Sequence, residues 1–150
     1  MCIREVSGKA FVLPDAITKV SQTDLLDRPE SHGASILVVS AQNFGLEDDY
    51  RQAMTALKLW SIKALLGTSF DVTFREHATT EGIVCAEISD EDHDVITRHI
   101  RGEKDLFIID LHNLTIITAR QLRCAKIHLP DEHRRAFLND TFRSLSFATH

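Results

Sequence analysis

The sequence predicts an α/β fold with a mixed sheet and flanking helices, and three apolar runs carry this prediction. Ile36–Val39 is continuously apolar, which is typical of a strand buried on both faces. Residues 62–66 and 83–88 form two similar runs, and each follows a segment with the spacing of a helix. Strands that alternate with helices in this way favour a parallel sheet covered by helices.

The other elements follow from turn signals and apolar spacing, and we expect all of them to belong to one domain, 1–150. The expected strands are residues 8–13, 35–39, 62–66, 83–88, 106–111, 114–118 and 124–129. The expected helices are residues 48–60, 68–82, 89–102 and 130–138. Residues 16–26 are irregular or weakly helical, and residues 27–34 form a turn-rich loop. The order predicts a βαβαβα unit followed by antiparallel strands and a closing helix.

Helix starts are marked by capping residues. Thr68-Ser69-Phe70-Asp71 has the T-x-x-D pattern of a capping box, and Gly82 is expected to end that helix. Ser89 opens the next helix, and Pro130 the last one. The acids at 47–49 lie at the start of the first helix, where its dipole stabilises each by about 0.3–1 kcal/mol.

Composition excludes several function classes. The net charge of −5 and pI of 5.9 argue against nucleic acid or an anionic membrane as the main partner. Cys2, Cys85 and Cys124 lack the spacing of a disulfide framework or a cluster ligand set, and Cys85 is expected in the core. With no signal peptide or membrane span apparent, we expect a cytoplasmic protein. The eight histidines contain no i,i+4 pair and no H-x-H, so a metal site is not expected. No other bound cofactor is expected either.

Two strand ends turn directly into helix starts, and ligands of open α/β sheets usually bind there. Asn43-Phe44-Gly45 follows the strand at 35–39, and Gly67-Thr68-Ser69 follows the strand at 62–66. We therefore expect a crevice between these two turns.

The same stretch resembles a known family. The residues that carry the resemblance are Asn43-Phe44-Gly45, Ala53, Ala56, Leu57, Lys58, Ile62–Leu66, Ser69-Phe70, Phe74 and Gly82, without a gap. They are similar to the pattern N-F-G-x-G-S-S-R-E-H-A, G-I-x-A-V-I, S-F-A-x-I-F and N-G-L of the small subunit of isopropylmalate dehydratase. That subunit is the stand-alone form of the aconitase swivel domain.

The resemblance implies a swivelling β/β/α fold and a chemistry shared with a partner. In the family, this domain closes over a large subunit that holds a [4Fe–4S] cluster, and the pair dehydrates and rehydrates a hydroxy polycarboxylate. The Gly-Ser-Ser-Arg turn supplies a Ser base and an Arg that binds a substrate carboxylate. Outside the centre, Gly8–Leu13, residues 102–118 and His133–Asp140 resemble other family segments more weakly.

This sequence departs from the pattern at the turn itself. Glu47, Asp48, Asp49 and Tyr50 stand where the family has Gly, Ser, Ser and Arg, and Arg51 follows one position later. A dianionic substrate would face carboxylates here, and at an effective dielectric near 20 each pair at about 4 Å costs roughly 4 kcal/mol. Arg51 is a poor substitute for the lost Arg, because one helical step rotates a side chain by about 100°.

Two further departures concern substrate recognition. Ile17-Thr18-Lys19-Val20 stands where the family has I-D-T-D, and only Leu26–Ala34 remains where the family has a recognition loop. The fold is therefore expected from the resemblance, whereas the hydro-lyase activity is not.

We expect one of three functions. The first is a repurposed, cofactor-free lyase, isomerase or cyclase acting on a less anionic, even hydrophobic and natural-product-like, small molecule. Its acid/base candidates are Asp48 and Asp49, with Tyr50 as a hydrogen-bond donor. The substrate-binding candidates are Asn43, Glu47, Arg51, Thr68, Ser69 and His77. Each of these residues could instead have a structural role. It could cap a helix, be a solvated charge, or shield the start of a helix.

The second function is the small subunit of an iron–sulfur hydro-lyase, with a large subunit as partner. The third is a non-catalytic binding or regulatory protein that keeps only the fold. A homo-oligomer and, less favoured, the large subunit stay open as protein partners.

Overall fold

The computed structural model describes residues 2–13, 20, 33–46, 49–102, 106–118 and 124–144. Within these residues seven strands form one sheet, in the order β4-β3-β2-β1-β5-β6-β7. The strands are β1 Glu5–Val12, β2 Ala34–Val38, β3 Ala64–Gly67, β4 Val84–Glu87, β5 Leu106–Asp110, β6 Thr115–Thr118 and β7 Cys124–Lys126. The helices are α1 Tyr50–Leu59, α2 Val72–Thr80, α3 Asp90–Gly102 and α4 Asp131–Leu138, followed by the 3-10 helix η3 Phe142–Ser144. The predicted α/β fold with a mixed sheet and flanking helices is confirmed.

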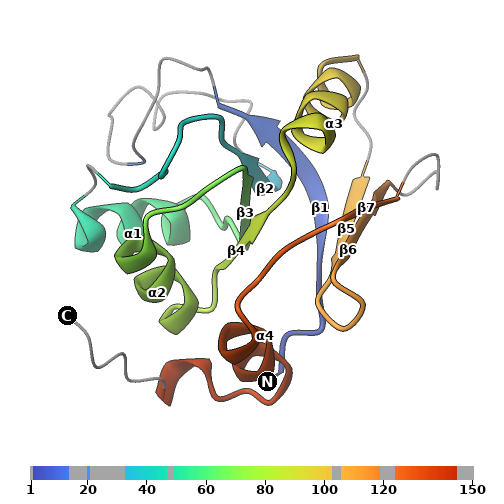
Figure 1. Ribbon diagram of the computed structural model, residues 1–150. Helices are drawn as coiled ribbons and strands as arrows, with labels where there is room; N and C mark the ends of the chain where they lie inside the picture. Colours follow the sequence, from blue (N-terminus) through green and yellow to red (C-terminus); the bar gives the residue numbers. More distant parts are fainter. Residues whose placement is uncertain are drawn as a thin grey trace.

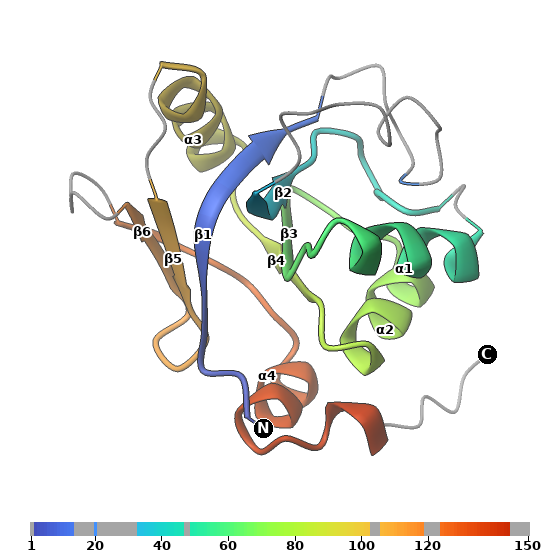
Figure 2. The same ribbon diagram turned by 180° about the vertical axis from the view of Figure 1, so that it is seen from behind.

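The strand β1 joins two different halves of the sheet. On one side β1, β2, β3 and β4 run parallel, as the strand–helix alternation predicted. On the other side β1, β5, β6 and β7 pair antiparallel, and the predicted hairpin is β5–β6. In Figure 1, β1 is the long blue strand between these two halves, and Figure 2 shows the same arrangement from behind.

Both faces of the parallel half are covered, which explains the continuous apolar run in β2. Leu37 and Val39 point into a core shared with α1 and α2, which lie side by side on that face (Figure 1). Ile36 and Val38 point into a second core that contains Ile96 of α3 and side chains of α4. The helices α3 and α4 lie at opposite ends of the sheet in all three views.

The sheet curls until its two outer ends meet. The backbone N–H of Glu87, at the end of β4, donates to the carbonyl of His128 at 3.0 Å, and His128 N–H donates back at 2.7 Å. The predicted strand at 124–129 is therefore shorter, since β7 ends at Lys126 and only this single bridge follows. The curl encloses the second core between the sheet, α3 and α4.

One helix start was predicted wrongly. The helix α2 begins at Val72, not at Thr68, and Asp71 is its N-cap with its carboxylate accepting from Phe74 N–H at 3.0 Å. Thr68 and Ser69 precede the helix, and Phe70 forms a bridge with Phe44 instead. A tertiary contact thus overrides the local capping pattern.

Other predictions are settled more simply. Cys85 is a fully buried core residue, as expected, and burial raises the pKa of its thiol. None of the helices in the described ranges has the length and apolar character that a bilayer crossing needs. The irregular segment predicted at 16–34 lies outside the described residues, apart from residues 20, 33 and 34. That 1–150 forms one domain stays a prediction.

Candidate functional site

Two turns meet at the carboxyl ends of β2 and β3. Phe44 N–H donates to the Ser69 carbonyl at 3.1 Å, and Asp71 N–H donates to the Phe44 carbonyl at 2.9 Å. The Ser69 hydroxyl accepts from Asn43 N–H at 2.8 Å and donates to the Gln42 side-chain oxygen at 3.1 Å. The predicted residues Asn43 and Ser69 are thus brought together, and they fasten the two turns to each other.

Backbone geometry explains two residues of the first turn. Asn43 has φ 48° and Gly45 has φ 97°, in the left-handed region that Asn and Gly tolerate best. A Cβ on Gly45 would lie 2.2 Å from Cγ of Phe74, a fully buried ring of α2. Gly45 therefore permits the close approach of this turn to α2.

Asp49, at the position of the second family Ser, caps α1. Its carboxylate accepts from the backbone N–H groups of Arg51 at 3.1 Å and Gln52 at 3.3 Å. These are two of the N–H groups that a helix start leaves without a partner in the helix. The side chain of Arg51 is exposed on the first turn of α1. Glu47 and Asp48 lie outside the described residues, so their predicted roles stay predictions.

Tyr50, at the position of the family Arg, connects α1 to α2. Its hydroxyl donates to Asp71 Oδ2 at 3.0 Å, the carboxylate that caps α2. Its ring stacks on His77 with centroids 4.9 Å apart and planes 20° from parallel. The predicted residues Tyr50 and His77 are therefore in contact with each other, and this contact holds the two helices together.

A crevice of about 850 Å³ lies beside these turns, at the ends of β2 and β3 and under α3. We call it the β2–β3 crevice. Its lining residues are Ser40, Ala41, Gln42, Thr68, Asp90, His93, Asp94, Thr97 and Arg98. Of the predicted site residues within the described ranges, Thr68 lines it, whereas Asn43, Asp49, Tyr50, Arg51, Ser69 and His77 do not. The crevice was predicted at the correct strand ends, but its second wall is α3.

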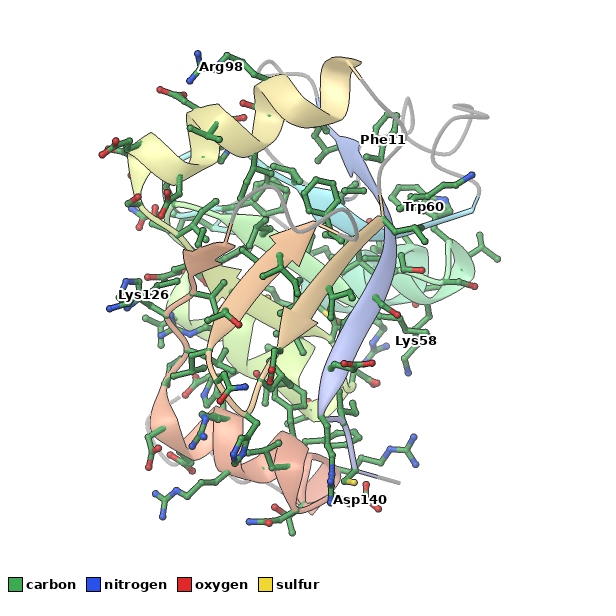
Figure 3. The ribbon with its side chains drawn as sticks, turned by 90° about the vertical axis from the view of Figure 1, so that its right-hand side faces the viewer. Phe11, Lys58, Trp60, Arg98, Lys126 and Asp140 are labelled. Carbon is green, nitrogen blue, oxygen red and sulfur yellow. The ribbon has the colours of Figure 1, made fainter. Side chains whose placement is uncertain are left out.

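The inner wall and the rim of this crevice differ in charge. The half-buried Ser40 and Thr68, together with the nearly buried Thr97, provide neutral hydroxyl groups beside the His93 imidazole. The carboxylates of Asp90 and Asp94 are exposed at the rim. Figure 3 shows the side chain of Arg98 directed away from the sheet, so its charge also lies outside. The lining is polar, so a ligand would bind to it through hydrogen bonds.

His93 was missed by sequence reasoning. Its Nε2 lies 3.0 Å from the backbone carbonyl of Val39, at the end of β2, 54 residues earlier in the chain. A signal did exist, because His93 lies in the first turn of a capped helix that follows a third buried strand. The rule that identified the first two turns applies equally to this one.

Metal-ligating side chains do not gather anywhere in the described ranges: no group of three or more His, Cys, Asp or Glu residues there could hold an ion. Cys2 is exposed and Cys85 is buried in the core. The described residues therefore contain no ligand set for the [4Fe–4S] cluster. The family resemblance assigns that cluster to the large subunit.

Comparison with known proteins adds sequence relatives and a structural neighbour. No family model matches the chain. The 3-isopropylmalate dehydratase small subunit of Thermus thermophilus is 32% identical over 114 residues, which are 75% of this chain and 55% of that protein. The subunit of Rhizobium rhizogenes is 32% identical over 120 residues (79% and 58%), and that of Roseiflexus castenholzii is 30% identical over 129 residues (85% and 57%). The chain thus spans a little over half the length of these curated relatives.

The structural comparison agrees with the sequence comparison. The crystal structure of 3-isopropylmalate dehydratase from Methanocaldococcus jannaschii matches with a TM-score of 0.64 at 18% identity, over 90% of this chain and 88% of that one. This likeness confirms the swivel-type α/β fold. The chain is therefore a member of the isopropylmalate dehydratase small-subunit-like family.

Proposed function

We propose that this protein is a repurposed member of its family, a cofactor-free lyase, isomerase or cyclase whose small-molecule substrate carries fewer negative charges than a polycarboxylate. One observation carries the proposal. Asp49 and Tyr50 stand where the family has its second Ser and its Arg, and both side chains are engaged in holding α1 and α2. This part of the turn presents neither a base of the Ser type nor a cation toward a carboxylate.

Electrostatics supports the same proposal. In the family the Arg at this turn forms a charge-assisted hydrogen bond with the substrate, worth about 1.5–3 kcal/mol. Here Asp49 and Asp71 supply negative charge to the two helix starts. Replacement of a cation by anions reverses the sign of the interaction with a dianion, and each carboxylate pair about 8 Å apart costs roughly 2 kcal/mol. A neutral or singly charged substrate avoids this cost.

Complementation with a large subunit tests the proposal. The purified chain is mixed with the cluster-loaded large subunit of a 3-isopropylmalate dehydratase, and dehydration of 3-isopropylmalate is followed. We expect neither a stable complex nor turnover, while the matching native small subunit, as the control, restores both. Turnover supported by this chain would contradict the proposal.

A second arm restores the family turn. The fourfold variant Glu47→Gly, Asp48→Ser, Asp49→Ser, Tyr50→Arg carries the family residues at all four positions. If the turn alone blocks the reaction, this variant gains dehydratase activity that the native chain lacks. If it stays inactive although folded, the missing recognition segment contributes as well.

The alternative is a working small subunit of an iron–sulfur hydro-lyase. The names of its relatives favour it, as does the retained contact between the Asn43-Phe44-Gly45 turn and Phe70. A complex with turnover in the experiment above would establish this alternative. A complex without turnover would instead favour the non-catalytic partner.

A further inference from the structure

We infer that Nδ1 of His93 is the proton acceptor of the β2–β3 crevice, and that this crevice binds a neutral molecule bearing hydroxyl or carbonyl groups. The inference rests on the proposed function and deepens it, because it names a residue outside the family's catalytic turn.

The hydrogen bond of His93 fixes which of its nitrogens carries the proton. A backbone carbonyl only accepts, so Nε2 donates to Val39 O across the 3.0 Å between them. In the neutral imidazole the lone pair is then on Nδ1. Within the described part of the chain, Nδ1 makes no hydrogen bond. A base held by an orienting partner, with its lone pair left for another group, is the arrangement that proton transfer requires.

The wall opposite α3 contains a second group in need of a partner. The hydroxyl oxygen of Thr68 is buried, and no hydrogen-bond partner is found for it among the described residues. Such an atom costs about 1–3 kcal/mol. Thr97, beside His93, donates its hydroxyl hydrogen to carbonyls of its own helix at 2.9 and 3.1 Å, so its oxygen can accept from a ligand. A molecule that reaches both walls of the crevice would therefore donate to the Thr97 oxygen and supply the partner that the Thr68 hydroxyl lacks.

Charge selects the class of that molecule. The described charged groups of the crevice are Asp90 and Asp94 against Arg98, all on α3, and Ser40–Gln42 and Thr68 add none. The two acids and the one base of the rim sum to a net charge of −1. A dianion is repelled there, whereas a neutral hydroxy amide, ester or ketone is not, and it can form hydrogen bonds with the polar lining.

The proton transfer balances without a co-reactant. Nδ1 takes the proton from a carbon next to a carbonyl group, and the C–H electron pair moves into the carbonyl to form an enolate. The imidazolium then returns the proton to a carbon conjugated with the enolate, so that a double bond shifts and the carbonyl is restored. The net reaction is an isomerisation, in which nothing is oxidised or reduced.

The first experiment observes the tautomer. In long-range 1H–15N NMR spectra of protein labelled at histidine, at about pH 8, where an ordinary imidazole is neutral, we expect the His93 Nε2 signal in the protonated range and its Nδ1 signal in the unprotonated range. His93→Gln assigns the signals by removing them, and it keeps a donor for Val39 O without the second nitrogen. A protonated Nδ1 in the neutral ring would overturn the inference.

The second experiment tests the ligand class with malamide and malate, which share a carbon skeleton and differ by two charges. Titration with malamide should move the amide signals of Thr68 and His93, and malate should bind at least about tenfold more weakly. Equal or tighter binding of malate, or malamide shifts elsewhere only, would overturn the assignment of the crevice.

Substitution of Thr68 separates a binding role from a structural one. Thr68→Val replaces the partnerless hydroxyl with a methyl group of similar size, so we expect an unchanged or higher Tm and about threefold to tenfold weaker malamide binding. Thr73→Val, on α2 outside the crevice, serves as the control and should leave binding unchanged. A loss of stability in Thr68→Val without weaker binding would contradict the role given to this hydroxyl.

These measurements are independent of the large-subunit experiment. If the chain supports 3-isopropylmalate dehydration, the proposed function fails whatever malamide does. If His93 has the other tautomer, this inference fails while the loss of hydro-lyase activity still holds.

Discussion

The turn at α1 and the β2–β3 crevice lie at the same ends of neighbouring strands, yet their polar groups differ in one respect. In the turn, Ser69, Asp49 and the Tyr50 hydroxyl all have partners within the protein. In the crevice, the Thr68 hydroxyl has no partner among the described residues, and His93 bonds through one of its two nitrogens. The motif thus marks the position of the family's catalytic turn, whereas hydrogen-bond partners show which side chains are available to a ligand.

The strongest test of the structural role of the turn is Gly45→Ala. The new Cβ would meet Phe74 at 2.2 Å with φ at 97°, so we expect a loss of about 3 kcal/mol in the free energy of unfolding. Urea denaturation followed by circular dichroism measures it.

Gly33→Ala is the matched control, because Gly33 has φ 93° and, apart from its chain neighbours, none of the described residues comes within 4 Å of its Cβ position. It should cost about 1 kcal/mol, the backbone strain alone. Equal losses in the two variants would show that the contact with Phe74 is relaxed, and that the turn is not tightly packed on α2.

His133 is a second histidine held by a hydrogen bond, but unlike His93 it is buried in the core, so the two can be compared. His133 of α4 is 4% exposed, and its Nδ1 lies 3.0 Å from the Thr79 hydroxyl. Thr79 donates its hydrogen to the Arg75 carbonyl at 2.8 Å, so His133 donates to Thr79 through Nδ1–H. Burial, and then the charge of Arg75, lower the pKa of His133 from 6.5 to about 4.

This shift predicts a pH dependence of stability. A lowered pKa means that the unfolded state binds the proton more readily, so the contribution of neutral His133 is complete above pH 6.5. It is lost as the pH falls from 6.5 to about 4, by a total of about 3 kcal/mol. His133→Asn keeps a donor near Thr79 but does not titrate. The native chain should therefore lose about 3 kcal/mol more than this variant between about pH 7 and pH 4, measured by urea denaturation.

The smallest expected effect belongs to Tyr50→Phe. It removes the hydrogen bond to Asp71 but keeps the ring on His77, so we expect a loss of about 1 kcal/mol of stability. If Tyr50 only fastens α1 to α2, malamide binding stays unchanged. Weaker binding in a stable Tyr50→Phe protein would give Tyr50 the ligand-binding role first predicted for it, and would remove the contrast between turn and crevice.

Much of the fold could be predicted from the sequence, because its signals are local. The continuous run in β2 indicates burial on both faces, and its side chains do alternate between two cores. The start of α2 was wrong because Phe70 pairs with Phe44, a contact that no local capping pattern reports. Gly45 is a similar case, because the need for glycine there comes from the closeness of Phe74, a residue distant in the sequence.

The site was less accessible to sequence reasoning. The end of the second predicted strand predicted Thr68 at the crevice, whereas the ungapped motif pointed to the turn beside it. It drew attention to changed residues, Asp49 and Tyr50, whose partners are found only once α1 and α2 are in place. His93 escaped notice because its partner, Val39 O, is 54 residues away in the chain.

The central position of β1 has a consequence for biosynthesis. This strand is made before the other strands of the sheet, and its Glu5 pairs with Asp110 of β5, far later in the chain. Until that segment leaves the ribosome, one edge of β1 has no strand to bind, and such distant pairing folds slowly. Deletion of β1 would also remove the strand between the two halves of the sheet. During synthesis the unpaired edge of β1 can therefore form hydrogen bonds with strands of other chains, so the risk of aggregation is highest at that stage.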